Sequence, residues 1–353
     1  NQRLKHGKLA RGEWQIHAVF FKRARAQIKY KATKINRFVF CRRCAWRFNG
    51  WAAAQHSMDV AYYKTNDEAL PHLADVDIIY AAATGGGSKL AEAAPHLKWF
   101  CSVSAGVDPV LKPGVLPDGC LLSNSSGAYG VTIAEHLVMV TLMLVRRYPE
   151  YAEIIRHHEW KNNLPLRSIK GSRVTIVGTG DIGTRYAERI QSFQPAAIIG
   201  VSRTGRKRSP VYDTVVKQEE LESYLPKTDI LVLCLPGTKE TTNMISRERL
   251  AMLPEDAFVI NVGRGNSIDQ AALVEALNAG HLAGAALDVM AKEPIPEGDP
   301  LWTAKNVILT PHCSGKMTLA YTRDKTVEMF CEDLEHFVKQ EPLEHEVKRD
   351  LGY

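Results

Sequence analysis

Polar residues end three strand-like runs in the second half of this chain, where they could do chemistry. Arg264 stands between two glycines after the first run, Glu293 follows the second, and His312 ends the third. A guanidinium presents a planar fork of donors that suits a carboxylate or a carbonyl oxygen. An imidazole gives and takes protons near neutral pH, and a carboxylate beside it can fix its tautomer. Taken singly, such residues are often ordinary surface groups; together, at strand ends, they predict acid–base chemistry on an anionic substrate.

A glycine-rich turn indicates a second kind of site. The β-branched run Val174–Val177 leads into Gly178, Gly180 and Gly183, spaced as G-x-G-x-x-G, and a helical stretch follows. Gly178 allows a tight turn, Gly180 lets the backbone approach a pyrophosphate, and Gly183 lets strand and helix pack closely. The N–H groups at the helix start then face the phosphates. This order predicts a dinucleotide site, with an ordinary strand–turn–helix connection as the alternative.

The end of the next predicted strand indicates which dinucleotide binds. NAD sites usually carry an Asp or Glu about 20 residues after the glycines, and no acidic residue stands there in this chain. The strand ends instead with Ser202, Arg203 and Thr204, and three more cationic residues follow at 206–208. We therefore predict NADP as the cofactor, with Arg203 as the main contact of its 2′-phosphate and Ser202 and Thr204 assisting. NAD is the weaker alternative cofactor. The alternative interpretation is that these residues form a solvated basic loop without a binding role.

The elements that must position these residues alternate regularly between positions 174 and 310. Strand, helix and strand in succession predict a parallel sheet with helices on both faces. The predicted strands are Val174–Val177, Ala197–Val201, Ile230–Leu235, Phe258–Val262, Ala285–Val289 and Val307–Leu309. The predicted helices include Thr184–Ile190, behind the glycines, and Gln270–Asn278, which ends just before Gly280.

A smaller α/β unit precedes this region. Buried-type strands are predicted at Val76–Ala81 and Trp99–Val103, and a first strand at Arg37–Cys41. The stretch from Lys316 to Lys339 predicts a helix that must pack outside the nucleotide-binding region. A C-terminal helix that returns to the first unit would meet that requirement.

The predicted fold class is α/β, with two doubly wound parallel-sheet domains. A Rossmann nucleotide-binding domain is inserted into a flavodoxin-like substrate domain. The predicted division is a basic extension of unknown role (1–33), a substrate domain (34–145 plus 317–353) and a dinucleotide-binding domain (146–316).

With these motifs in this order, the chain resembles the D-isomer-specific 2-hydroxyacid dehydrogenase family, which includes glyoxylate/hydroxypyruvate reductases and D-lactate dehydrogenases. The matching motifs are Gly178–Gly183, Asn261–Gly265, Asp288–Pro294, Thr310–His312, Ser104–Asp108 and Ala134–His136. Arg264 and Glu293 are 29 positions apart, and Glu293 and His312 are 19 apart, as in the family. The resemblance runs from residue 58 to Tyr353 and is weak to absent in residues 1–57.

The chemistry that this implies is the reduction of a 2-oxo acid to a D-2-hydroxy acid. Hydride transfer to the 2-oxo carbon leaves negative charge on the carbonyl oxygen, so an acid must supply a proton there. His312 is the candidate acid, Glu293 would hydrogen-bond its far ring nitrogen, and Arg264 would hold the substrate carboxylate and carbonyl. Three consecutive backbone N–H groups would cradle the same carboxylate in a nest: Ala105, Gly106 and Val107.

The resemblance implies further contacts that the residues alone do not identify. The additional cofactor-binding positions are Asp181 and Ile182 at the pyrophosphate turn, Leu235, Pro236 and Thr238 along the ribose, Asp288 on the nicotinamide carboxamide, and Val262, Gly263 and Gly315. The segment Tyr129–Arg147 resembles the family's dimerisation region, which implies a homodimer. The expected substrates are small unbranched acids such as glyoxylate, hydroxypyruvate or pyruvate, and the pocket wall near Ala82–Gly87 does not identify one of them.

Composition excludes some classes of function. The longest apolar stretch, Val131–Val145, has 15 residues and includes Glu135 and His136, so it is too short and too polar for a membrane span. Residues 1–60 carry 14 Lys and Arg against Glu13 and Asp59, a net charge of +12, whereas the net charge of the whole chain is +6. A basic arm can bind nucleic acid, but no other feature supports that role. We expect neither membrane nor nucleic-acid partners.

Cysteine usage indicates a reducing compartment. The seven cysteines are scattered and odd in number, which suits free thiols in the cytoplasm. Cys41-x-x-Cys44 lacks a second Cys or His pair at zinc-site spacing, so no metal is expected.

Two alternative functions remain open at this point. Some relatives of the family are non-enzymatic co-repressors that bind NAD(P)H to assemble, and the three candidate catalytic residues alone do not exclude that role. Formate dehydrogenase is the alternative among enzymes, but that branch does not use a glutamate where Glu293 stands.

Overall fold

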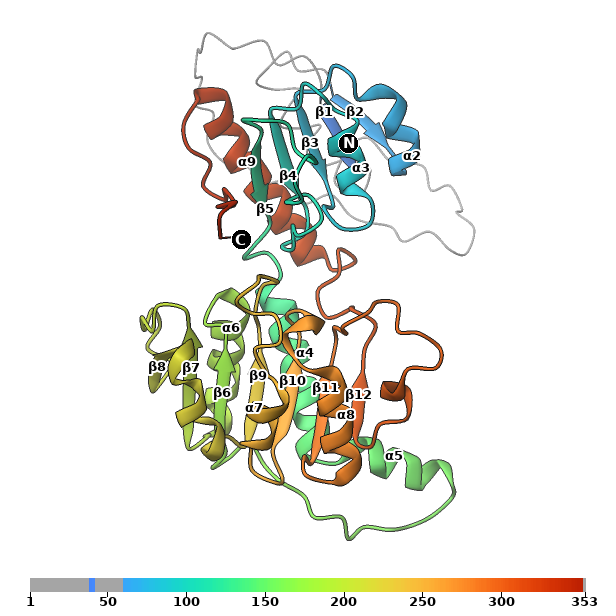
Figure 1. Ribbon diagram of the computed structural model, residues 1–353, viewed down its shortest axis with the longest axis vertical. Helices are drawn as coiled ribbons and strands as arrows, with labels where there is room; N and C mark the ends of the chain where they lie inside the picture. The colour runs from blue at the N-terminus through green and yellow to red at the C-terminus, as the bar shows by residue number, and fades with distance from the viewer. Residues whose placement is uncertain (1–37, 42–59, 352–353) are drawn as a thin grey trace, which may run out of the picture. The chain divides into compact units, whose positions relative to one another are not determined.

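A computed structural model describes residues 38–41 and 60–351 of the chain (Figure 1). The predicted basic extension, residues 1–33, lies outside the described residues, as does much of the segment up to residue 57. The predicted first strand at Arg37–Cys41 is present as β1, Phe38–Cys41.

The first sheet has five parallel strands. They are β1, β2 (Val60–Tyr63), β3 (Ile78–Ala81), β4 (Trp99–Ser102) and β5 (Leu121–Asn124). Their order is β2-β1-β3-β4-β5, and every pairing is parallel. This is the strand order of flavodoxin-like folds. The predicted fold of the substrate domain is therefore confirmed, although sequence periodicity indicated neither β2 nor β5.

The C-terminal helix packs on this first sheet, as its amphipathic pattern requires. The helices around the sheet are α2 (Asn66–Ala69), α3 (Gly87–Glu92) and α9 (Ala320–Lys339). Phe330 of α9 stacks on Trp99 of β4 at 5.2 Å between ring centroids, and Leu334 joins the same buried cluster. The Trp99 indole N–H donates to Ser123 Oγ at 2.9 Å, so its one polar atom is satisfied inside the core.

The second sheet has seven parallel strands. They are β6 (Arg173–Val177), β7 (Ala197–Ser202), β8 (Thr214–Lys217), β9 (Ile230–Leu233), β10 (Phe258–Asn261), β11 (Gly284–Leu287) and β12 (Val307–Leu309). Their order is β12-β11-β10-β9-β6-β7-β8. Read outward from β6, this is the Rossmann order with one additional strand, and the order reverses between β6 and β9. A ligand crevice is expected at that point, beyond the carboxyl ends of the strands.

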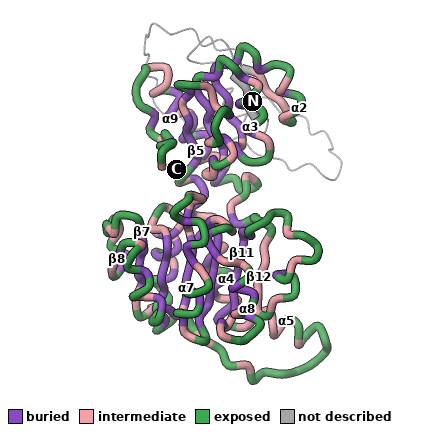
Figure 2. Tube along the Cα trace, viewed as in Figure 1, coloured by how far each residue is buried: buried purple, intermediate pink, exposed green. Residues whose placement is uncertain are grey.

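Helices cover both faces of the second sheet (Figures 1 and 2). One apolar cluster joins the sheet to α4 (Gly130–Val145) and α6 (Asp181–Ile190). The other joins it to α7 (Arg247–Ala251) and α8 (Gln270–Ala279). α8 ends at Gly280, whose φ of 77° makes it a left-handed cap, as predicted.

The packing of α4 departs from the predicted domain boundary at residue 145. The boundary assigns this helix to the substrate domain, but its buried side chains belong to the core of the seven-stranded sheet. The hydroxyl groups of Thr141 on α4 and Tyr186 on α6 lie 2.8 Å apart in that core. The reason is physical: α4 is apolar on much of its circumference and needs a sheet and a helix to cover it.

Several predicted elements are longer than the observed ones. The predicted strands ending at Leu235 and Val289 stop two residues earlier, because the buried residues beyond them belong to loops at the sheet edge. The C-terminal helix begins at Ala320 rather than Lys316. Among the described residues, no helix combines the length and the apolar character needed to cross a membrane.

Candidate active site

The glycine turn between β6 and α6 has the geometry that a dinucleotide requires. Gly178 has a φ of 103°, and a Cβ there would come within 2.5 Å of the Cys234 carbonyl oxygen. A Cβ on Gly183 would come within 2.1 Å of the Gly178 carbonyl oxygen. At Gly180, which caps α6, a Cβ would meet nothing within 4 Å, so the space beside the turn is open. Two glycines thus allow close packing, and the third leaves room for a ligand.

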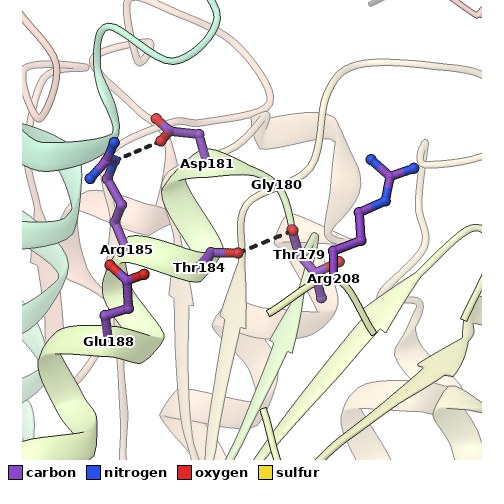
Figure 3. Close-up of a pocket in the computed structure, with 7 residues that line it drawn as sticks. All are labelled: Thr179, Gly180, Asp181, Thr184, Arg185, Glu188 and Arg208. Carbon is purple, nitrogen blue, oxygen red and sulfur yellow. Dashed lines mark hydrogen bonds and ion pairs between the residues drawn. The ribbon is translucent and has the colours of Figure 1, made fainter. Parts of the chain in front are cut away.

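Charged and polar side chains line a pocket at the start of α6 (Figure 3). The Arg185 Nε–H donates to Asp181 Oδ1 at 2.7 Å, which directs that guanidinium toward the first turn. The Thr184 hydroxyl donates to the Thr179 carbonyl at 3.2 Å. Arg208 lines the same pocket, an assignment that the sequence analysis did not make. The first N–H groups of α6 have no partners within the helix and are available to an anion.

The cationic segment after β7 lies on one side of this turn. The Ser202 hydroxyl accepts the Gly205 N–H at 3.1 Å, and Gly205 reverses the chain with a φ of 64°. Arg203 and Thr204 are exposed. The Lys207 ammonium is turned back, because it donates to the Asp213 carbonyl at 3.3 Å. Beside a dinucleotide turn, the remaining cations fit a phosphate on the adenosine ribose.

The loop after β9 lies on the other side of the turn, because β6 stands between β7 and β9. Thr238 and Thr241 tie this loop into a compact turn, with the Thr241 hydroxyl donating to the Pro236 carbonyl at 2.7 Å. Hydrogen bonds to its own backbone and to the Thr238 side chain lower the pKa of the Glu240 carboxyl, and the charges of Lys239 and Arg203 also contribute. The predicted contacts at the ends of β7 and β9 therefore flank the glycine turn on its two sides.

Close backbone packing positions Arg264 at the end of β10. A Cβ on Gly263 would come within 2.6 Å of Leu235 backbone atoms. A Cβ on Gly265 would come within 1.9 Å of the Met290 backbone. The two glycines thus fix Arg264 between the loops that follow β9 and β11. Val262, just before them, is buried.

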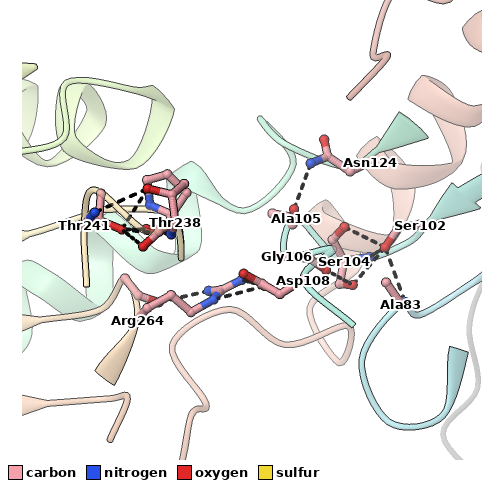
Figure 4. Close-up of polar contacts among 12 residues, drawn as sticks. Ala83, Ser102, Ser104, Ala105, Gly106, Asp108, Asn124, Thr238, Thr241 and Arg264 are labelled. Carbon is pink, nitrogen blue, oxygen red and sulfur yellow. Dashed lines mark hydrogen bonds and ion pairs between the residues drawn. The ribbon is translucent and has the colours of Figure 1, made fainter. Parts of the chain in front are cut away.

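The Arg264 guanidinium contacts the loop after β4, as Figure 4 shows. Its Nη2 donates to Asp108 Oδ2 at 3.0 Å, and its Nη1 donates to the Gly263 carbonyl at 2.9 Å. It also lies against Gly106, where a Cβ would approach Nη2 to 1.9 Å. Arg264 and the predicted carboxylate nest, which lie far apart in sequence, are therefore brought together.

Hydrogen bonds to neighbouring polar side chains hold the nest. The Ala105 carbonyl accepts Asn124 Nδ2–H at 2.8 Å, and the Gly106 carbonyl accepts the Ser104 hydroxyl at 3.0 Å. The N–H groups of the three nest residues have no acceptor within the part of the chain that the structure describes. They are available to an anion beside Arg264.

His312 and Glu293 form the contact that their spacing predicts. His312 Nδ1 lies 2.8 Å from Glu293 Oε2, and the second carboxylate oxygen accepts the Met290 N–H at 3.0 Å. The Nδ1 atom therefore carries a proton toward the carboxylate, which leaves Nε2 for a ligand. His312 has a φ of 49°, a left-handed conformation that few non-glycine residues adopt and that concentrates at functional sites.

Asp288 anchors the segment that carries His312. Its carboxylate accepts the hydroxyl groups of Thr310 and Ser314 at 2.6 and 2.5 Å and two backbone N–H groups, from Cys313 and Ser314. Burial alone would raise the pKa of the Asp288 carboxyl, but these four hydrogen bonds outweigh it and lower the pKa. Asp288 is only 2% exposed, so its carboxylate is occupied by the protein's own donors. Its implied contact with the nicotinamide carboxamide stays a prediction.

Gly315 and His136 complete the surroundings of this segment. Gly315 packs on the start of α4, where a Cβ would approach Ile133 Cδ1 to 2.9 Å. His136 Nε2 lies 3.3 Å from Thr310 Oγ1. Burial lowers the pKa of the His136 imidazole, and the nearby Asp288 charge opposes that effect. No role was predicted for His136 or Asp108 from the sequence, although both stand in motifs that match the family.

The predicted site residues thus form two groups along the same sheet edge. The phosphate-binding candidates stand at the ends of β6, β7 and β9, and the candidate catalytic residues at the ends of β10 and β12 and in the loop after β11. This division suits a dinucleotide, which the glycine turn and the cations after β7 would hold beside the candidate catalytic residues. The residues present therefore fit an NADP cofactor.

Comparison with known proteins also indicates a nucleotide-binding dehydrogenase. Residues 138–314 match the family model described as D-isomer specific 2-hydroxyacid dehydrogenase, NAD binding domain. A glyoxylate reductase of Thermofilum pendens is 31% identical to this chain over 307 residues, covering 83% of this chain and 89% of that protein.

Solved structures extend the similarity to the whole described fold. A D-isomer specific 2-hydroxyacid dehydrogenase family protein from Aeromonas salmonicida has a TM-score of 0.79 and 30% identity, covering 90% of this chain and all of that one. An NADPH-dependent glyoxylate/hydroxypyruvate reductase from Sinorhizobium meliloti, solved with NADP and sulfate, has a TM-score of 0.77 and 27% identity. The match to the Sinorhizobium meliloti structure covers 91% of this chain and all of the chain in that structure.

Proposed function

Because the chain belongs to the D-isomer specific 2-hydroxyacid dehydrogenase family and is an NAD(P)-dependent oxidoreductase of 2-hydroxy acids, we propose that it reduces small 2-oxo acids with NADPH. Glyoxylate, hydroxypyruvate and pyruvate are the proposed substrates. The 2.8 Å contact between His312 Nδ1 and Glu293 Oε2 carries this proposal, because it leaves Nε2 to deliver a proton. The co-repressor hypothesis receives no support from these relatives, which are named as reductases and dehydrogenases.

The proposed mechanism assigns one task to each residue. The cofactor, when bound, supplies the hydride that reduces the 2-oxo carbon. Arg264 and the nest at residues 105–107 bind the substrate carboxylate and orient the carbonyl. His312 Nε2 gives its proton to the carbonyl oxygen, and Glu293, from the Nδ1 side, stabilises the protonated ring that acts as the acid. Asp288 keeps the His312 segment in place through its four hydrogen bonds.

The test of the proposed function is the oxidation of NADPH, followed at 340 nm, with a panel of 2-oxo acids and with NADH beside it. We expect turnover with at least one of the three proposed acids and a preference for NADPH. Tight NADPH binding without turnover of any acid would contradict the proposal and favour a binding protein.

Replacing Arg203 with alanine should raise the KM for NADPH by about tenfold or more and leave the KM for NADH nearly unchanged. A charged hydrogen bond to the 2′-phosphate would be lost, which costs about 1.5–3 kcal/mol. Lys207→Ala is the matched control, because this neighbouring cation is turned back onto the Asp213 carbonyl. Equal changes for both cofactors would show that Arg203 does not select NADP.

We also propose a homodimer in the cytoplasm. Apolar side chains stand exposed along α4, α5 (Tyr148–Arg156) and the segment that follows, namely Met139, Tyr148, Ile155, Trp160 and Leu166. Trp160 is 88% exposed, which a second copy of this chain would relieve. Five cysteines are free thiols, which suits a reducing compartment: Cys101, Cys120, Cys234, Cys313 and Cys331.

The dimer proposal predicts a change of mass in solution. Sedimentation velocity should give twice the chain mass of 39.3 kDa for the wild type and a shift toward the monomer for Trp160→Ser combined with Ile155→Asp. An unchanged dimer in the double variant would mean that another surface forms the interface.

A further inference from the structure

Asp108 binds one particular edge of the Arg264 guanidinium. Its Oδ2 accepts Nη2–H at 3.0 Å and Nε–H at 3.4 Å, and both N–H groups lie on the same side of the planar group. The contact joins the loop after β4 to the end of β10 across 156 positions of sequence (Figure 4). Asp108 belongs to the Ser104–Asp108 motif, yet the proposed mechanism gives it no task.

Arg264 has N–H donors left that are available to a second anion. A guanidinium has five N–H donors. Asp108 takes one on Nε and one on Nη2, and the Gly263 carbonyl takes one on Nη1 at 2.9 Å. One N–H on each terminal nitrogen is left, and a guanidinium with two such donors can bind a carboxylate.

Close packing fixes this arrangement. A Cβ on Gly237 would come within 2.7 Å of Asp108 Oδ1 and within 3.3 Å of Arg264 Cγ. A Cβ on Gly106 would come within 1.9 Å of Arg264 Nη2. The side chains of Arg264 and Asp108 are 29% and 43% exposed, and ion pairs at such exposure stabilise folds only slightly. The main effect of the contact is therefore to orient Arg264, and its contribution to the stability of the protein is small.

We infer that Asp108 is a positioning residue, which holds Arg264 so that its remaining N–H donors face the carboxylate of the substrate. The inference rests on the proposed function, because it assumes that Arg264 binds a 2-oxo acid. A guanidinium without Asp108 keeps its charge and loses its fixed orientation. Substrate binding is then weakened, while the cofactor end of the site is untouched.

The experiment compares Asp108→Ala and Asp108→Asn with the wild type. For Asp108→Ala we expect the KM for glyoxylate to rise by about ten- to a hundredfold, the cost of a small misplacement in a site, with a smaller fall in kcat and an unchanged KM for NADPH. Asp108→Asn should recover part of the loss, because its amide oxygen still accepts one N–H. Asp118→Ala is the matched control, an exposed aspartate in the same stretch without a partner among the described residues.

Binding of oxamate, an unreactive analogue of a small 2-oxo acid, separates this inference from the proposed function. Calorimetry on the NADPH complex should show about tenfold weaker binding for Asp108→Ala. If Asp108→Ala binds oxamate more weakly than the wild type, but the wild type turns over no 2-oxo acid, the proposed function is refuted and the inference is supported. A wild-type enzyme with turnover and an unchanged or lower KM in Asp108→Ala would overturn the inference, because Asp108 would then be a spectator or a competitor. The absence of both turnover and oxamate binding in the wild type would overturn both.

Discussion

Replacing His312 with glutamine is expected to lower kcat for glyoxylate by about 10²–10⁴-fold, the usual contribution of a positioned general acid. Glutamine fills a similar volume and can still donate to Glu293, but it cannot deliver a proton to the carbonyl oxygen. The structure separates these two tasks, because Glu293 Oε2 lies 2.8 Å from Nδ1 and leaves Nε2 for the substrate. The loss should therefore fall on kcat, with the affinity for NADPH unchanged.

Steady-state kinetics and NADPH fluorescence titration measure these two quantities separately. His96→Gln is the matched control, since His96 is exposed in the loop before β4 and has no partner among the described residues. Glu293→Gln should lose less activity than His312→Gln, because it removes the orienting charge and keeps the acid. A His312→Gln enzyme with near-normal kcat would assign the proton transfer to another group.

The site was predictable from sequence where a residue's role depends on its neighbours along the chain. Gly178 and Gly183 were assigned to a tight turn and to strand–helix packing, and the structure gives each the backbone contact that excludes a Cβ. Polar residues after buried strands were expected at one sheet edge, because parallel strands share their carboxyl ends. The pairing of His312 with Glu293 followed from the family resemblance and is present as a 2.8 Å contact.

The features of the fold and the site that were not predicted from the sequence depend on contacts between distant segments. Asp288 receives its four hydrogen bonds from residues 22 to 26 positions further along, so its sequence context did not indicate that its carboxylate is already occupied. Asp108 meets Arg264 across 156 positions. The strands β2, β5 and β8 all lie at the edges of their sheets. Edge strands are less fully buried than the inner strands, so their sequences carry a weaker apolar signal. The strands that periodicity did identify lie mostly in the apolar interior of the sheets.

Replacing Arg264 with lysine is expected to reduce kcat/KM for glyoxylate by about a hundredfold or more. Lysine keeps the positive charge but offers no planar fork, and each charged hydrogen bond that is lost costs about 1.5–3 kcal/mol. A lysine also cannot reach Asp108 and Gly263 with fixed donors while it presents two more to a carboxylate. Arg247→Lys is the matched control, because Arg247 forms an exposed ion pair with Glu275 in the same domain. Near-wild-type kinetics for Arg264→Lys would mean that charge alone binds the substrate.

The Arg264→Lys variant also tests the task of Asp108 through a double-mutant cycle. If Asp108 acts only by orienting the guanidinium, then Asp108→Ala should raise the KM for glyoxylate in the wild type and change it little once Arg264 is lysine. Additive effects would mean that Asp108 influences the substrate by another route, such as its own charge beside the nest. Because the two residues contact each other at 3.0 Å, the coupling energy is the quantity that the geometry predicts to be large. Substrate orientation would then depend on a pair of residues from loops that follow strands of two different sheets, with the arginine making the contact and the aspartate setting its direction.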